Sequence, residues 1–203
     1  ILEFKTKSKN ISHLLKTDIP KNVFVSWSLN PQIFIDNEEH GTASLEQRLN
    51  SAKKLSDKGV LVGFHFHPIV YYEGYENDYK HIVRKVMSMF HSSQIAMISM
   101  GTLTFIKPAI NKLRSTGLKS KVLQIPMEDA VGKSSYTKEI KKEIFSNVYD
   151  EFSSWHKDLF FYLCMEESSI WEMVFGNYYR SNSDFETALF ESVSSKMDAL
   201  QVV

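Results

Sequence analysis

The sequence VLVGFHFHP at residues 60–68 decides the fold, because its alternate residues differ sharply in polarity. In an extended strand, successive side chains point to opposite faces. One face of this predicted strand would carry Val60, Val62, Phe64 and Phe66, and the other would carry Leu61, Gly63, His65 and His67. The first face is wholly apolar, whereas the second turns polar toward the carboxyl end of the strand.

Two other predicted strands show the same division. VFVSWSL at 23–29 has Ser26 and Ser28 on its polar side, and LFFYLCME at 159–166 has Tyr162, Cys164 and Glu166 opposite Phe161, Leu163 and Met165. A sheet covered by helices on both faces would need continuous apolar runs. The observed division instead favours a (β/α) barrel with functional residues at its mouth. The predicted mouth is lined by Lys7, Ser28, His65, His67, Ser99, Cys164 and Glu166.

The rest of the chain alternates predicted strands with predicted helices. Further strands are expected at 2–7, 94–100 and 121–125, and helices at 10–16, 44–58, 75–90, 106–115, 138–154, 168–175 and 184–198. After a loop, Ser44 and Gln47 form a capping-box pattern that starts the second helix, and Gly59 is expected to close it. This alternation predicts an α/β fold with a parallel sheet. Residues 1–203 show no linker, so we expect one domain, an open or partial (β/α) barrel.

The composition is that of an ordinary globular protein. Hydrophobic residues make up 43% of the chain, and 24 lysines and arginines balance 24 aspartates and glutamates. No overall field therefore attracts nucleic acid or an anionic membrane, and no apolar run approaches the ~20 residues of a membrane span. The single cysteine, Cys164, fits a reducing cytosol, so a cytoplasmic location is expected. Because the chain begins Ile-Leu-Glu without a methionine, we expect it to be part of a longer protein whose N-terminal part is missing.

His65 and His67 are candidate metal ligands, because a His-x-His pair at a strand end holds zinc in some barrel hydrolases. A catalytic zinc takes three protein ligands and a water molecule, and no spacing singles out a third ligand here. The other interpretation is that both histidines are hydrogen-bonded side chains in a polar barrel mouth. A zinc-dependent (β/α)-barrel hydrolase therefore stays open as an alternative hypothesis. A cubane iron–sulfur cluster held within this chain is excluded, since it needs several thiolates.

Four stretches of the sequence together resemble the spore photoproduct lyase family of radical S-adenosylmethionine proteins. They are SLNPQIFIDNEEHGTASLEQRL at 28–49, GVLVGFHFHPIVYYEGYENDY at 59–79, ISMGTLTF at 98–105 and LCMEESSIWEMVFG at 163–176. The resemblance implies that the chain is the C-terminal part of a partial (β/α) barrel with a helical tail. It also implies that the intact protein repairs a thymine photoproduct in DNA by 5′-deoxyadenosyl radical chemistry, with S-adenosylmethionine and a 4Fe-4S cluster. The cluster ligands lie in the family's N-terminal half, so this fragment alone is expected to be inactive.

The resemblance implies roles for individual residues of the mouth. Lys7 in FKTKS, Ser28 in SLN and His67 directly before Pro-Ile match family positions that approach S-adenosylmethionine. His65 would line the substrate side of the same mouth, and neither histidine would hold a metal. The family's hydrogen-donating cysteine lies in the N-terminal half, so Cys164 does not inherit that role.

The family's DNA-contacting hairpin corresponds to MEDAVGKSSY at 127–136. In true spore photoproduct lyases this hairpin is rich in arginine, lysine and aromatic residues. Here it offers Lys133 and Tyr136 as expected contacts to damaged DNA.

Overall fold

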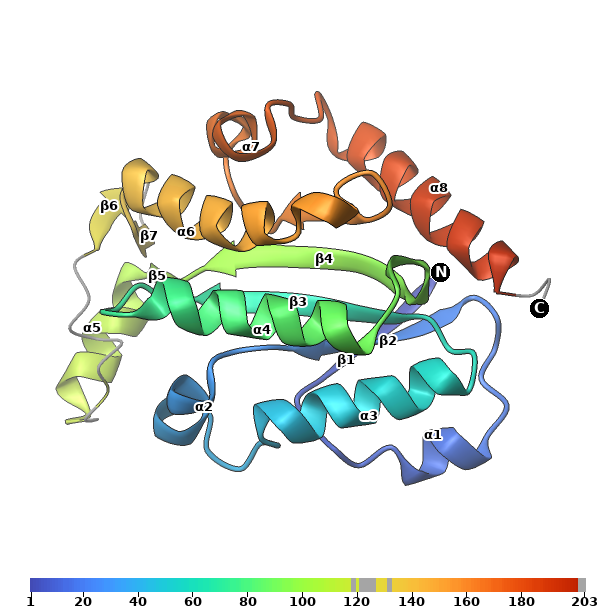
Figure 1. Ribbon diagram of the computed structural model, residues 1–203. Coiled ribbons are helices and arrows are strands. Elements are labelled where there is room, and N and C mark those ends of the chain that lie inside the picture. The colour runs from blue at the N-terminus through green and yellow to red at the C-terminus, as the bar shows by residue number, and fades with distance from the viewer. Residues whose placement is uncertain (118–119, 121–126, 131–132, 201–203) are drawn as a thin grey trace.

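The computed structural model describes residues 1–117, 120, 127–130 and 133–200. A five-stranded sheet lies at its centre (Figure 1), in the order β1, β2, β3, β4, β8, and every neighbouring pair is parallel. The strands are β1 (Leu2–Thr6), β2 (Val23–Ser28), β3 (Val62–Ile69), β4 (Ile95–Thr102) and β8 (Phe160–Leu163). Their carboxyl ends therefore meet at one edge of the sheet, which confirms the predicted α/β class.

Helices follow most of these strands. They are α1 (Ser12–Lys16), α2 (Gln32–Glu38), α3 (Leu45–Asp57), α4 (Tyr75–Met89), α5 (Lys107–Ser115), α6 (Lys138–Glu151), α7 (Ser168–Phe175) and α8 (Asn182–Ala199), with 3-10 turns at Ser92–Gln94 and Ser153–Trp155. In Figure 1, α3, α4 and α6 run along the sheet, while α8 lies near the end of the sheet where the N-terminus of the chain is marked. A second sheet of three antiparallel strands, in the order β5, β7, β6, contains β5 (Thr104–Ile106), β6 (Glu128–Ala130) and β7 (Lys133–Ser135).

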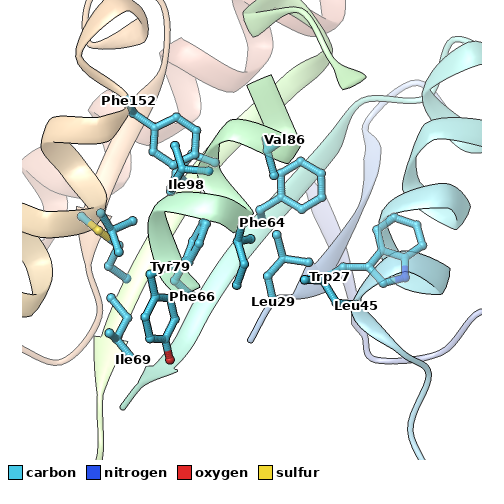
Figure 2. Packing of buried hydrophobic residues seen from close by; sticks show 14 of the residues in the cluster. Trp27, Leu29, Leu45, Phe64, Phe66, Ile69, Tyr79, Val86, Ile98 and Phe152 are labelled. Carbon is cyan, nitrogen blue, oxygen red and sulfur yellow. The ribbon is translucent and has the colours of Figure 1, made fainter. Parts of the chain in front are cut away.

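The main hydrophobic core lies between the sheet and helices α3, α4 and α6. Trp27, Phe64 and Phe66 belong to it, and all three side chains are fully buried (Figure 2). The ring of Phe66 meets that of Phe152, just beyond α6, edge to face at a centroid distance of 6.1 Å. Each large apolar side chain buried in this way stabilises the fold by roughly 1.5–3 kcal/mol.

The opposite face of the sheet, here called the inner face, divides into two zones. Near the amino ends of the strands, Phe24, Leu61 and Met97 form a smaller apolar cluster with Val193 and Met197 of α8. Toward the carboxyl ends, polar side chains replace them. The predicted alternation is therefore confirmed in β2 and β3, with one apolar face and one face that becomes polar.

Local signals at the start and end of α3 also agree with the structure. Ser44 is the N-cap of α3, and its side chain and that of Gln47 form the reciprocal capping box. Gly59 has φ +87°, in the left-handed region that a residue with a side chain seldom adopts. The capping side chain of Ser44 stabilises the protein by about 1 kcal/mol.

Two expectations are corrected. The loop expected before Ser44 contains helix α2, in which Ile35 alone is buried, so its apolar periodicity is too weak to see in the sequence. Met165 does not continue the apolar face of β8, because the strand ends at Leu163 and Met165 takes φ 60°, where the residue is 78% exposed. The strand expected at 121–125 lies outside the described residues. Among the residues that are described, no helix is both long and apolar enough to cross a membrane.

Candidate functional site

His65 and His67 of β3 lie side by side on the inner face. Their ring centroids are 5.3 Å apart, with the ring planes at 82°. Ser28 of β2 and Ser99 of β4 are the register partners of His65 on its two sides. Because residues in register share a face of the sheet, these polar side chains form one row at the carboxyl ends of three strands.

Glu3 of β1 completes this row, although the sequence did not single it out. His65 Nε2 lies 2.5 Å from Oε1 of Glu3, and Ser26 donates a hydrogen bond to the same oxygen. Burial alone would raise the pKa of Glu3, but the hydrogen bonds from His65 and Ser26 outweigh it, so the carboxyl pKa is lowered. Glu3 has the same strand parity as Lys7, which is the signal that could have found it.

His65 is a neutral donor in this arrangement. Burial lowers the pKa of its imidazole more than the Glu3 carboxylate raises it. Nε2–H therefore donates to Glu3, and Nδ1 carries the lone pair. Nδ1 is buried and has no hydrogen-bond partner among the described residues.

His67 belongs to a second hydrogen-bonded group. Its Nε2 lies 2.9 Å from Oγ of Ser99, and the side chain of Tyr162 also hydrogen-bonds Ser99. Burial, with the nearby Lys5 ammonium and His65, lowers the pKa of His67 to about 3, and burial raises the pKa of Tyr162 to about 12. A Cβ on Gly101 would lie 2.9 Å from Nε2 of His67, so this glycine leaves room for the ring.

A buried ion network lies at the rim of the inner face, where Lys7 follows β1. Lys7 Nζ is 2.7 Å from Oε1 of Glu39, and Arg48 Nη2 is 2.6 Å from Oε2. Asn30 donates to Glu39 Oε1 at 2.8 Å, and Arg48 also donates to the carbonyl of Ser28 at 2.9 Å. Glu39, in the acidic segment at 36–39, thus supplies a carboxylate that ties Lys7 to Arg48 of α3.

The hairpin residues lie in the smaller sheet. β6 and β7 pair as an antiparallel hairpin within 127–136. Lys133 of β7 is exposed. Tyr136 is only 4% exposed, and its hydroxyl accepts a hydrogen bond from the backbone N–H of Tyr71 at 3.1 Å, so it anchors the hairpin to the loop after β3.

The side chains of Cys164 and Glu166, which follow β8, lie in different surroundings. Cys164 is half-buried near the inner face, and burial raises the pKa of its thiol. Glu166 was expected at the mouth, but its carboxylate binds Lys141 of α6 at 2.7 Å and Thr102 at 2.9 Å. The positive φ of Met165 redirects the chain between these two residues, which is why the strand alternation fails at Glu166.

Metal ligands do not gather at this site. Across residues 1–117, 120, 127–130 and 133–200, no group of three or more histidine, cysteine, aspartate or glutamate side chains could hold an ion. His65 and His67 use their Nε2 atoms for Glu3 and Ser99 instead. The zinc hydrolase hypothesis therefore has no support from the geometry.

Sequence comparisons with known proteins all point to one family. A family model described as spore photoproduct lyase matches residues 1–152. The spore photoproduct lyase of Clostridium acetobutylicum is 27% identical over 139 residues, which cover 66% of this chain and 38% of that protein. The Bacillus subtilis spore photoproduct lyase is 34% identical over 85 residues, or 42% of this chain and 25% of that protein. The matched segments thus cover well under half of the length of these relatives.

Solved structures show the same fold. A cysteine-to-alanine mutant of spore photoproduct lyase aligns with TM-score 0.70 and 22% identity, covering 80% of this chain and 51% of that one. A double mutant of spore photoproduct lyase with bound S-adenosylmethionine and dinucleoside spore photoproduct aligns with TM-score 0.68 at the same identity. The predicted partial (β/α) barrel is confirmed, and no comparison supports a zinc hydrolase.

Proposed function

The chain belongs to the spore photoproduct lyase family, and on that premise we propose that the protein containing it is a radical S-adenosylmethionine lyase that repairs a thymine photoproduct in DNA. The observation that carries this proposal is the row of hydrogen-bonded, uncharged groups formed by His67, Ser99 and Tyr162. With a pKa of about 3, His67 is a poor general base near pH 7. Such a surface suits a site where the cofactor carries the hard chemistry and the protein supplies orientation.

We propose that Lys7, Ser28 and His67 bind S-adenosylmethionine. Thr6 of β1 pairs in register with Trp27 of β2. Lys7 follows Thr6 and Ser28 follows Trp27, so Lys7 and Ser28 are neighbours at the rim. The Lys7 side chain is 36% exposed, so it keeps ammonium protons for the cofactor carboxylate besides the one given to Glu39. S-adenosylmethionine bound beside a reduced cluster would supply the radical chemistry, and Lys7, Ser28 and His67 would hold and orient it.

The 4Fe-4S cluster would be held elsewhere in the protein. Cys164 is the only cysteine of the 203 residues, and a cubane cluster is usually held by four thiolates. The chain also matches only 38% and 25% of the length of two curated relatives, which leaves ample sequence for a cluster-binding segment. This chain would then contribute the cofactor-orienting and substrate-facing half of the site.

The proposed substrate side includes His65, Lys133 and Tyr136. His65, fixed by Glu3, would shape the pocket that receives the flipped thymine lesion. Lys133 is exposed on the hairpin and would contact the DNA. Tyr136 is buried, so its contribution would be to hold that hairpin in place rather than to touch the lesion through its hydroxyl.

The test is an anaerobic assay of the full-length protein that carries this chain. The protein would be incubated with reductant, S-adenosylmethionine and a dinucleoside spore photoproduct, and the restored thymidines measured by chromatography and mass spectrometry. We expect turnover that depends on the cofactor and is lost when reductant is omitted. If the protein binds neither the cofactor nor the photoproduct and restores no thymidine, the proposal is wrong.

A further inference from the structure

A polar pocket opens beside the loop that follows β1, at the edge of the sheet where the strands have their carboxyl ends. The cavity has a volume of about 490 Å³. Its lining consists of Thr6, Lys7, Ser8, Lys9, Asn10, Gly41, Thr42, Ala43 and Gln47. From the sequence, the basic stretch at 5–9 reads as solvated surface, and the proposed function leaves most of this stretch without a role.

The lining is positively charged and contains no acidic residue. Lys7 and Lys9 are its two charged residues. The carboxylate paired with Lys7, that of Glu39, is 5% exposed and is also bound by Arg48 and Asn30. The pocket therefore presents cations on its surface and keeps the balancing negative charge behind it.

Several hydrogen-bond donors in the lining are free, although Lys7 and Thr42 already donate to Glu39. The side-chain oxygens of Ser8, Asn10 and Gln47, in contrast, already accept hydrogen bonds. Ser8 Oγ accepts from the N–H of Asn10, and Oδ1 of Asn10 accepts from Ser12. Gln47 Oε1 accepts from the N–H of Ser44. Within the part of the chain that the structure describes, the Lys9 ammonium and the side-chain amide groups of Asn10 and Gln47 reach no acceptor.

The loop is also rigidly attached to the barrel. The indole of Trp27 donates to the carbonyl of Ser8 at 2.9 Å, and Ser51 donates to the carbonyl of Lys9 at 3.3 Å. The lining is therefore built in advance of any ligand. Lysine, serine, threonine, asparagine and glutamine side chains are the groups with which proteins contact DNA phosphates.

We propose that this pocket, centred on Lys9, binds a backbone phosphate of the DNA strand that enters the mouth. This inference rests on the proposed function and adds a phosphodiester site to it. The carboxylate of S-adenosylmethionine is also an anion, but Lys9 is exposed outside the inner face, where a passing DNA backbone can reach it. Such a contact positions the substrate without reading its sequence.

Binding measurements with three ligands test the proposal on the full-length protein. The ligands are a duplex oligonucleotide that carries the photoproduct, the dinucleoside photoproduct without backbone phosphate, and S-adenosylmethionine. The variants are Lys9→Ala, Lys9→Arg, and Lys54→Ala as a control that removes the same charge from an exposed position near the other end of α3.

We expect Lys9→Ala to bind the duplex about three- to tenfold more weakly at low salt and to reduce the slope of log affinity against log salt by about 0.9. Binding of the dinucleoside and of S-adenosylmethionine should not change, Lys9→Arg should retain duplex affinity, and Lys54→Ala should behave as the parent protein.

Equal duplex binding by Lys9→Ala and Lys54→Ala would overturn the inference, as would weaker S-adenosylmethionine binding by Lys9→Ala. If the parent binds and repairs the dinucleoside but never binds the duplex, the phosphate site is wrong while the proposed function stands. If the parent binds and repairs neither ligand, the proposed function fails as well.

Discussion

Glu3 and His65 are separated by 62 positions in the chain, yet Oε1 of Glu3 lies 2.5 Å from Nε2 of His65. The contact spans β2, whose Ser26 donates to the same carboxylate oxygen. Since β1 is the edge strand of the sheet, this contact ties the edge to the strand that carries both histidines.

Glu3→Gln should lower the pKa of His65 further, because the Glu3 carboxylate is what raises it against the effect of burial. The loss of a charged hydrogen bond should also reduce the free energy of unfolding by about 1–2 kcal/mol. Titration of the His65 ring by NMR and urea unfolding measure the two effects. Glu191→Gln, on an exposed position of α8, should change neither. A higher pKa of His65 in Glu3→Gln would contradict the pairing.

His67 should make the protein less stable as the pH falls. Its pKa is about 3 in the folded protein, against about 6.5 in an unfolded chain. Between these values the unfolded state binds the extra proton, so the free energy of unfolding decreases as pH drops below about 6.5, by up to about 1.4 kcal/mol per pH unit from this residue. Urea unfolding from pH 7.5 to 4.5 should show a shallower dependence in His67→Gln. His81→Gln, exposed on α4, should keep the parent slope, and an unchanged slope in His67→Gln would show that His67 is not buried as a neutral ring.

Lys7→Ala should weaken binding of S-adenosylmethionine about ten- to a hundredfold, since a charged hydrogen bond contributes roughly 1.5–3 kcal/mol. Isothermal titration of the full-length protein measures the affinity. The fold should survive, because Glu39 keeps its contacts with Arg48 and Asn30. Parent-like affinity in a folded Lys7→Ala protein would remove Lys7 from the cofactor site.

Glu39→Ala should destabilise the protein by about 3–5 kcal/mol, because it leaves the fully buried Arg48 guanidinium without its carboxylate. Asp57→Ala breaks the exposed pair with Lys53 on α3 and should cost about 0.5 kcal/mol or less. Chemical unfolding of the two variants compares a buried pair with an exposed one. Similar losses in both would mean that the Glu39 network contributes no more than a surface contact.

Much of the fold could be read from local sequence. The alternation in β2 and β3 and the capping box at Ser44 each depend on residues only two or three positions apart, so a few letters suffice to predict them. The same rule predicted that His65 and His67 share a face, which the structure confirms. It failed for Met165 and Glu166, because β8 ends at Leu163 and the period of two applies only while the backbone is extended.

Local sequence was enough to predict β2 and β3, their apolar and polar faces, and the polar residues Ser28, His65 and His67 at their carboxyl ends. Which charged groups meet could be read only from the folded chain. Asp36, Glu38 and Glu39 look alike in the sequence. Glu39 becomes the buried carboxylate because Lys7, just after β1, and Arg48 of α3 converge on it. Glu3 likewise reaches His65 only in the folded chain, where β1, β2 and β3 lie side by side. Ion pairs form between segments that are distant in the chain, and their partners are fixed only when packing brings those segments within a few ångströms of each other.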